Sequence, residues 1–130
     1  MIVDTSALVA ILEQEPEAER MARAIASAPV ASLSAATLVE TGIVVQARRG
    51  DEGARDLDLL IAKLGIVIEA LTTRQADIAR KAYRLYGRGQ HPAALNLGDC
   101  FTYALASDMS EPLLAKGNDF CHTDLSLVHY

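Results

Sequence analysis

The chain has 130 residues, of which 51% are hydrophobic and 22% are charged, and this length and composition indicate one globular domain over residues 1–130 and exclude a disordered chain. The start of the chain lacks the basic region of a signal peptide, no stretch approaches the roughly 18 apolar residues that span a bilayer, and two cysteines are too few for a disulfide framework, so we expect a cytoplasmic protein with no membrane contact. The net charge of −5 excludes nucleic-acid binding that is driven by overall positive charge. It does not exclude a nucleic-acid enzyme whose metal ions neutralise an acidic site.

Short runs of β type alternate with longer runs of helical type along the chain. Helix caps are predicted at Ser34, at Thr72 or Thr73 and at Asn96, and Gly50 is predicted to end a helix. In chain order, the predicted elements are a strand at 1–3, helices at 6–13 and 16–28, a strand at 30–32, helices at 35–49 and 51–64, a strand at 64–68, a helix at 73–86, a loop at 87–92, a helix at 97–107 and strands at 113–115 and 126–129. Such alternation predicts an α/β fold with a mostly parallel sheet covered on both faces.

Two acidic residues in the first half of the chain stand out by their position. Asp4 ends the first predicted strand, where ligands bind in open α/β sheets, but it is equally placed to cap the following helix. Glu40 lies in a helix that is apolar on most of its circumference, where a carboxylate is costly unless it is paired or bound to a metal ion. The alternative for Glu40 is a narrow polar stripe shared with Thr37, Thr41 and Arg48.

The second half of the chain adds further acids near predicted helix starts and strand ends. Asp99 follows the predicted cap Asn96 by three residues, where a carboxylate also favours the helix dipole. Asp119 follows a predicted strand, Asp124 lies close behind it, and both are also ordinary turn residues. Asn118 offers one more oxygen ligand.

Carboxylates gathered at one edge of a sheet repel each other unless a cation lies between them. Mg²⁺ and Mn²⁺ favour carboxylate and water oxygens, and such ions activate water and stabilise the leaving oxygen in phosphoryl displacement. The pattern therefore favours metal-dependent hydrolysis of phosphodiester bonds.

Four ordered blocks of sequence resemble the PIN-domain ribonucleases, and most closely the VapC-type toxins of bacterial toxin–antitoxin (VapBC) pairs. The blocks are MIVDTSALVAIL at 1–12, ATLVE at 36–40, LGDC at 97–100 and PLLAKGNDF at 112–120 with Thr-Asp at 123–124. The resemblance covers essentially the whole chain. It implies a three-layer α/β/α fold around a parallel sheet, Mg²⁺- or Mn²⁺-dependent endonucleolytic cleavage of RNA, a homodimer, and a cognate VapB-type antitoxin that occludes the acidic pocket.

The resemblance also implies roles for particular residues. An acidic quartet that serves as catalytic and metal-binding residues is carried over onto Asp4, Glu40, Asp99 and Asp119. Ser6 matches the small hydroxyl residue that orients the site. The fourth position of the quartet stays open between Asp119, Asn118 and Asp124, because similar sequences often carry another Asp where this chain has Asn118.

Basic residues gather in one part of this acidic chain. Five of its 12 basic residues fall between 74 and 88, and the spacing of Arg80, Arg84 and Arg88 can place them on one helix face toward RNA phosphates, although a solvated helix face is the simpler interpretation. Lys116, beside the fourth acidic block, is the favoured contact for a substrate phosphate. Apolar positions at 8, 11, 12, 43 and 44 can form a partner groove or, by default, pack in the core.

A non-catalytic function is the alternative hypothesis. A divalent-ion-binding α/β regulatory or interaction module, similar to a receiver domain, would also place acids at the strand ends. Such modules use an early adjacent acid pair, whereas here Asp4 is followed by Thr5.

Overall fold

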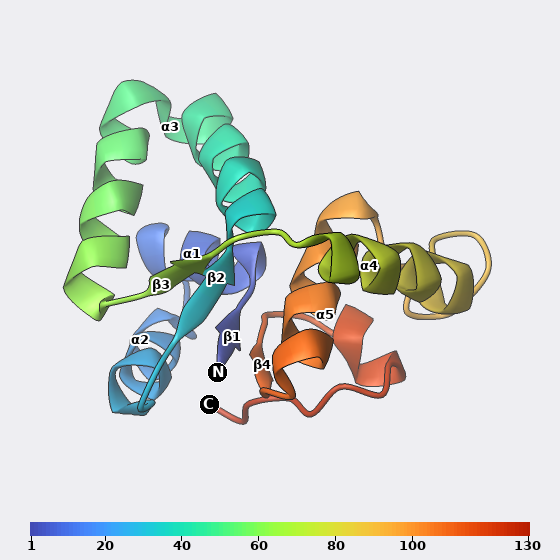
Figure 1. The fold of residues 1–130 in the computed structure, drawn as a ribbon. Coiled ribbons are helices and arrows are strands. Elements are labelled where there is room, and N and C mark those ends of the chain that lie inside the picture. Colours follow the sequence, from blue (N-terminus) through green and yellow to red (C-terminus); the bar gives the residue numbers. More distant parts are fainter.

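A four-stranded parallel sheet forms the centre of the protein in the computed structural model, which describes residues 1–130 (Figure 1). The strand order is β3-β2-β1-β4. The strands are β1 (Ile2–Val3), β2 (Ser32–Ser34), β3 (Val67–Glu69) and β4 (Leu113–Leu114). Because β1 lies between β2 and β4, the residue that follows it emerges at the middle of the sheet's carboxyl edge.

Helices connect the strands and cover the sheet (Figure 1). They are α1 (Thr5–Leu12), α2 (Ala18–Ser27), α3 (Ala35–Leu64), α4 (Thr73–Tyr86), α5 (Leu97–Met109) and the 3-10 helix η1 (Asp119–His122). The predicted caps are confirmed, since Ser34, Thr72 and Asn96 each accept a hydrogen bond from a backbone N–H of the first turn. No helix is both long and apolar enough to cross a membrane.

Successive residues of the central strands face two different hydrophobic clusters. Val3 and Leu114 belong to a cluster with side chains of α1, α2 and α3, whereas Ile2 and Leu113 belong to one with side chains of α4 and α5. Side chains alternate across a strand, so a sheet with apolar residues on both faces needs a helical layer on each. The predicted three-layer α/β/α fold with a parallel sheet is confirmed.

The long element α3 consists of two helical arms that fold back on each other (Figure 1). Gly50 separates the arms with φ 62° and ψ −155°, a conformation that L side chains rarely adopt. The predicted boundary at Gly50 is therefore confirmed. Its consequence is that the first arm, which carries Glu40, runs out from the sheet edge while the second returns to begin β3.

The predicted strand at 126–129 is wrong. This segment makes one isolated bridge, between Leu127 and Leu113, with hydrogen bonds from Leu113 N to Ser126 O and from Val128 N to Leu113 O. The physical reason is that Leu113 is the one residue of β4 that exchanges backbone hydrogen bonds with this segment, so the bridge does not extend into a ladder. The helical turn η1 was not predicted, and β2 begins two residues later than expected.

Candidate active site at the carboxyl edge of the sheet

Asp4 is the central carboxylate of the site and is only 5% exposed. Its Oδ2 accepts hydrogen bonds from the backbone N (2.9 Å) and Oγ (2.6 Å) of Ser6, and its Oδ1 accepts one from Thr102 Oγ1 (2.8 Å). Asp4 is therefore the N-cap of α1, as one interpretation of the sequence predicted. The same bonds fix both of its oxygens at the sheet edge, so the capping role and a place in the site are compatible.

Ser6 links two segments that meet at this edge. Its hydroxyl donates to Asp4 and accepts a hydrogen bond from the backbone N of Lys116 at 2.9 Å. Lys116 follows β4, so this contact joins the start of α1 to the chain after the neighbouring strand. The geometry agrees with the orienting role expected for Ser6.

Glu40 reaches the site from the first arm of α3. Its Oε1 accepts a hydrogen bond from Thr5 Oγ1 at 2.6 Å, and Thr5 also shares a hydrogen bond with Thr41 at 2.9 Å. The carboxylate lies directly over Gly98 of α5, where a Cβ atom would come within 1.3 Å of Glu40 Oε2. A glycine at position 98 is thus what leaves space for the Glu40 carboxylate.

The polar stripe considered for Glu40 does not form as expected. Thr37 and Thr41 are fully buried, and Arg48 lies apart from them in an ion pair with Glu13 at 3.0 Å. The threonines face the interior between α3, α1 and α5, because Thr37 shares a hydrogen bond with Thr102 at 3.2 Å. They form part of the support of the site and not of a solvated surface.

Asp99 completes a capping box at the start of α5. Its backbone N donates to Asn96 Oδ1 at 2.9 Å, and its Oδ2 accepts from the backbone N of Asn96 at 3.0 Å. Burial raises the pKa of Asp99 to about 6, against the lowering effect of the Asn96 bond, and the negative charges of Asp4, Asp119 and Glu40 raise it further. The four predicted carboxylates are thus close enough for their charges to act on one another.

The three residues considered for the fourth position have different surroundings. Asp119 is exposed at the start of η1 and is one of the charges that raise the pKa of Asp99. Asp124 accepts a hydrogen bond from the Tyr103 hydroxyl at 2.7 Å. Asn118 is exposed and its side chain makes no capping bond. The structure therefore brings Asp119 toward the other carboxylates and ties Asp124 to Tyr103.

The side chain of Lys116 has partners within the protein. Its ammonium forms ion pairs with Glu15 and, at 3.3 Å, with Glu17, both of which belong to the segment between α1 and α2. Hydrogen bonding to Glu15 is the main cause that raises the pKa of Lys116. A substrate phosphate would have to compete with these two carboxylates for the ammonium.

The threonine side chains around the carboxylates were missed at the sequence level. Thr102 donates a hydrogen bond to Asp4 and Thr5 donates one to Glu40. The fully buried Thr37 and Thr41 support them, because Thr37 shares a hydrogen bond with Thr102 and Thr41 shares one with Thr5. The available signal was the occurrence of threonine inside otherwise apolar helices, because a buried hydroxyl needs a hydrogen-bond partner.

The donor set suits a hard divalent cation. The carboxylates supply only oxygen ligands, which Mg²⁺ and Mn²⁺ prefer, and burial together with the charges of the neighbouring carboxylates disfavours the ionised form of Asp99 in the metal-free protein. No three of the acidic, histidine or cysteine side chains lie close enough to enclose an ion by themselves. Residues of this kind fit an ion that keeps several water ligands.

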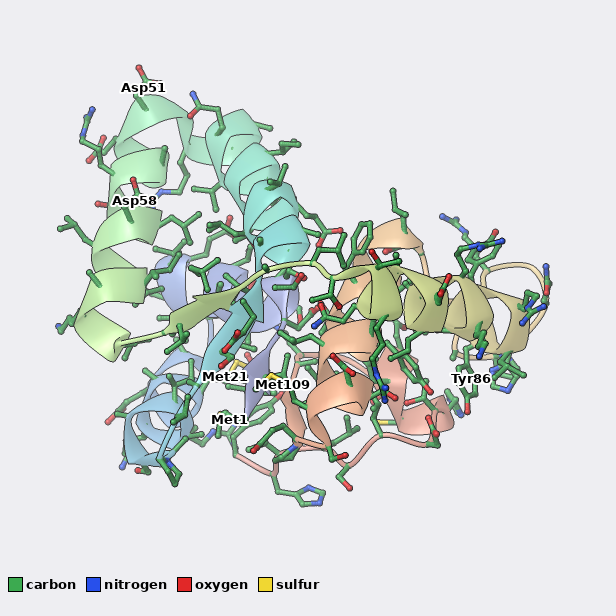
Figure 2. The ribbon with its side chains drawn as sticks, viewed as in Figure 1. Met1, Met21, Asp51, Asp58, Tyr86 and Met109 are labelled. Atoms are coloured by element: carbon green, nitrogen blue, oxygen red, sulfur yellow. The ribbon has the colours of Figure 1, made fainter.

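Other acidic side chains lie away from this edge. Figure 2 shows Asp51 and Asp58 on the outer side of α3, pointing away from the sheet, and both are exposed. The convergence of carboxylates near Asp99 is therefore a local property of the sheet edge.

Comparison with known proteins gives matches over nearly the whole chain. The family model described as "PIN domain" matches residues 1–125. Ribonuclease VapC from Mycolicibacterium smegmatis is 50% identical over 129 residues, which cover 99% of this chain and 100% of that protein. Ribonuclease VapC28 from Mycobacterium tuberculosis is 55% identical over 124 residues, covering 95% of this chain and 93% of that one.

Solved structures agree in fold. The crystal structure of Mycobacterium tuberculosis VapC20, described as a sarcin-ricin loop cleaving toxin, superposes with a TM-score of 0.77 at 21% identity and covers 99% of this chain and 98% of that one. A toxin–antitoxin complex from Klebsiella pneumoniae gives a TM-score of 0.73 at 18% identity, covering 99% of this chain and 97% of that chain.

Proposed function

The chain belongs to the PIN domain family, with VapC ribonucleases as relatives at about 50% identity, and on this premise we propose that it is a metal-dependent endoribonuclease and the toxin of a toxin–antitoxin pair. The membership and the fold predicted from the four sequence blocks are confirmed. The activity is supported by relatives named as ribonucleases that align with the chain from end to end.

The observation that carries the proposal is the gathering of carboxylates from four segments around Asp99. The Glu40 carboxylate lies over Gly98, the residue before Asp99, and Asp4 after β1, Glu40 in α3 and Asp119 in η1 add to the effect of burial in raising the pKa of Asp99. A protein stabilised only by its core would gain nothing from bringing these like charges together. A site that binds a cation and a phosphodiester gains a set of oxygen ligands.

We propose that the divalent ion, Mg²⁺ or Mn²⁺, binds among the carboxylates of Asp4, Glu40, Asp99 and Asp119 and keeps several water ligands, since no three of these side chains enclose an ion by themselves. When bound, such an ion supplies an activated water molecule and neutralises charge on the phosphate. Ser6 and Thr102 fix the two oxygens of Asp4, and Thr5 fixes Glu40. These residues hold the ligands in place before substrate arrives, so little reorganisation is needed in the reaction.

For Lys116 we propose that its backbone N–H, which donates to Ser6, contributes to the site. Contact between its ammonium and a substrate phosphate stays a prediction, because that ammonium is paired with Glu15 and Glu17.

We also propose a protein partner, an antitoxin encoded alongside, and a homodimeric assembly of the toxin in the cytoplasm. The Klebsiella pneumoniae relative in fold is described as a toxin–antitoxin complex. On α3, Val39 and Ile43 are 62% and 65% exposed, on the same helix as Glu40, and an apolar pair of this kind favours a protein contact. Leu8, by contrast, is fully buried in the core, as the default interpretation predicted.

The direct test is cleavage of purified total RNA with Mg²⁺, with Mn²⁺ and with EDTA. We expect metal-dependent cleavage that is lost in Asp4→Asn and in Glu40→Gln. Asp58→Asn is the matched control, because it removes the same charge from an exposed position on α3. Undiminished cleavage by folded Asp4→Asn would refute the proposed site, and intact RNA with the metal-loaded protein would refute the activity.

A further inference from the structure

A groove of about 970 Å³ runs between α4 and α5, outside the acidic site. Its rim carries four basic side chains, which are Arg80, Lys81, Arg84 and Arg88. The one acidic residue that lines it is Asp77, 3.6 Å from Arg80, and both of these side chains are largely exposed, so their attraction is weak. A chain with a net charge of −5 thus concentrates positive charge at this groove.

The basic side chains of the groove are largely free of internal partners. Lys81, Arg84 and Arg88 form no ion pair, and the groove gathers these three unpaired cations in one place. Elsewhere on the surface Arg23, Arg48, Arg49 and Arg74 each pair with a carboxylate, and the unpaired Arg55 and Lys63 lie on the second arm of α3. Unpaired cations that repel one another across a shared groove lower the stability of the protein slightly. Their placement is explained if an anionic ligand occupies the groove.

The floor of the groove is apolar and partly aromatic. Ala79 and Cys100 are buried where α4 packs on α5, Phe101 is half-buried, and Tyr83 at the rim is 44% exposed. Proteins that bind single-stranded nucleic acid combine cations along the backbone path with aromatic surfaces on which bases stack. The groove presents both features together.

The groove also reaches the acidic site through the start of α5. Its lining includes Asn96, Leu97 and Cys100, which lie on either side of Asp99 in the sequence. Leu97 is 72% exposed, and Asn96 is bonded to Asp99 in the capping box. The groove therefore ends at a residue that is hydrogen-bonded to the Asp99 carboxylate.

We propose that the α4–α5 groove binds the single-stranded RNA segment next to the cleaved bond, with its phosphates on Lys81, Arg84 and Arg88 and its bases against Tyr83 and Phe101. This inference rests on the proposed ribonuclease function and extends it from the cleavage site to the substrate path. Arg80 and Arg84, four residues apart, lie about 6 Å apart along the helix axis, so they can contact successive parts of one backbone.

A second copy of the chain is a less suitable occupant. In a two-fold dimer the same patch meets itself, so the cations of one groove would face those of the other and repel them. An acidic segment of another protein would satisfy the cations but not account for the continuity with Asp99. RNA satisfies both observations.

The test compares two double variants that remove the same charge. Arg84→Gln with Arg88→Gln changes the groove, and Arg55→Gln with Lys63→Gln changes two exposed cations without ion pairs on α3. Binding of a fluorescein-labelled single-stranded RNA of about 12 nucleotides, a length within the range of such sites, is measured in EDTA across a salt titration. Cleavage by each variant is measured in Mg²⁺ and Mn²⁺, and its oligomeric state by light scattering.

For single strands, each phosphate contact adds about 0.7 to the magnitude of the slope of log affinity against log salt concentration. The loss of two contacts therefore reduces that magnitude by about 1.4, which at 0.1 M salt corresponds to an affinity about 25-fold lower. We expect this change in the groove variant, with a raised KM and a nearly unchanged kcat, and no such change in the control. Tyr83→Leu is expected to weaken binding at least about fivefold with an unaltered slope, because stacking is not ionic.

Equal slopes and affinities in the two double variants would overturn the inference while cleavage by the wild type leaves the proposed function standing. Unchanged RNA binding together with an altered oligomeric state, or with loss of a coexpressed antitoxin, would assign the groove to a protein partner and also overturn it. A wild-type protein that neither binds nor cleaves RNA would refute the inference and the proposed function together.

Discussion

The contact between Gly98 and Glu40 allows a substitution whose effect on stability changes sign with the residue at position 40. In Gly98→Ala the new Cβ would lie 1.3 Å from Glu40 Oε2 and 2.3 Å from its Cδ. Atoms cannot approach so closely, so the Glu40 carboxylate must swing away. It then loses the hydrogen bond from Thr5, which is 2.6 Å long.

Two effects of known size compete in this variant. Replacing glycine by alanine in a helix stabilises by up to about 1 kcal/mol, and losing a hydrogen bond to a charged group costs about 1.5–3 kcal/mol. We therefore expect Gly98→Ala to destabilise the protein by about 1 kcal/mol. In the Glu40→Ala background the collision is absent, and the same substitution should stabilise by up to about 1 kcal/mol.

The assay is urea unfolding of the wild type, both single variants and the double variant in EDTA, combined with RNA cleavage in Mg²⁺. The coupling energy between the two positions is expected to be about 2 kcal/mol, within the usual range for residues in contact. Gly98→Ala should also lose cleavage, because Glu40 leaves the site. A single variant that is more stable than the wild type and cleaves RNA normally would refute the placement of Glu40 over Gly98.

Three further predictions concern the same site. Thr102→Val removes the hydrogen bond to Asp4 Oδ1, so it should lower the unfolding free energy by about 1.5–3 kcal/mol and abolish RNA cleavage. Thr102→Ser keeps the hydroxyl and should keep both stability and cleavage. Loss of both properties in the two variants alike would contradict a role for the hydroxyl. Because burial raises the pKa of Asp99 to about 6, its contribution to the stability of the metal-free protein is present below about pH 4 and is lost as the pH rises through 6. After discounting for its partial exposure this amounts to about 1–2 kcal/mol, and thermal unfolding in EDTA should show it in the wild type but not in Asp99→Asn. Lys116→Met should lower stability by at most about 1 kcal/mol and leave KM for RNA unchanged, since its ammonium pairs with Glu15 and Glu17; a raised KM would support the phosphate contact predicted from the sequence.

The layers of the fold were predictable because local signals and hydrophobic periodicity agree. Ser34, Thr72 and Asn96 are strong caps that fix where helices begin, and Gly50 marks the break in α3. The segment at 126–129 has the apolar residues of a strand, but it meets β4 at Leu113 alone, a tertiary property that no local pattern contains.

The gathering of carboxylates was predictable only in part. Asp4 follows a strand, and parallel strands end at a common edge, so its position followed from the strand prediction. The support of Asp4 and Glu40 by Thr102 and Thr5 could not be predicted, because it joins residues 98 and 35 positions apart in the sequence. The same holds for the pairing of Asp124 with Tyr103, which separates this acid from Asp119.

The sequence offered two interpretations of Asp4 and Asp99, as helix caps or as residues of an active site. In the structure the same side chains cap their helices and lie at the candidate site, so the two interpretations are compatible. Asp4 caps α1 and Asp99 closes the capping box of α5, so backbone N–H groups and the positive ends of two helices offset their charges without any cation. Glu40 has no such help, because it lies within α3 and depends on Thr5 and on the space over Gly98. These bonds fix where the Asp4 and Asp99 carboxylates lie, although burial still disfavours the charged form of Asp99 in the metal-free protein, whereas Glu40 is the carboxylate whose position is easiest to disturb. For this reason Thr5→Val should impair cleavage while leaving the Asp4 and Asp99 caps intact, and normal metal-dependent activity in that variant would show that Glu40 needs no support from its neighbour.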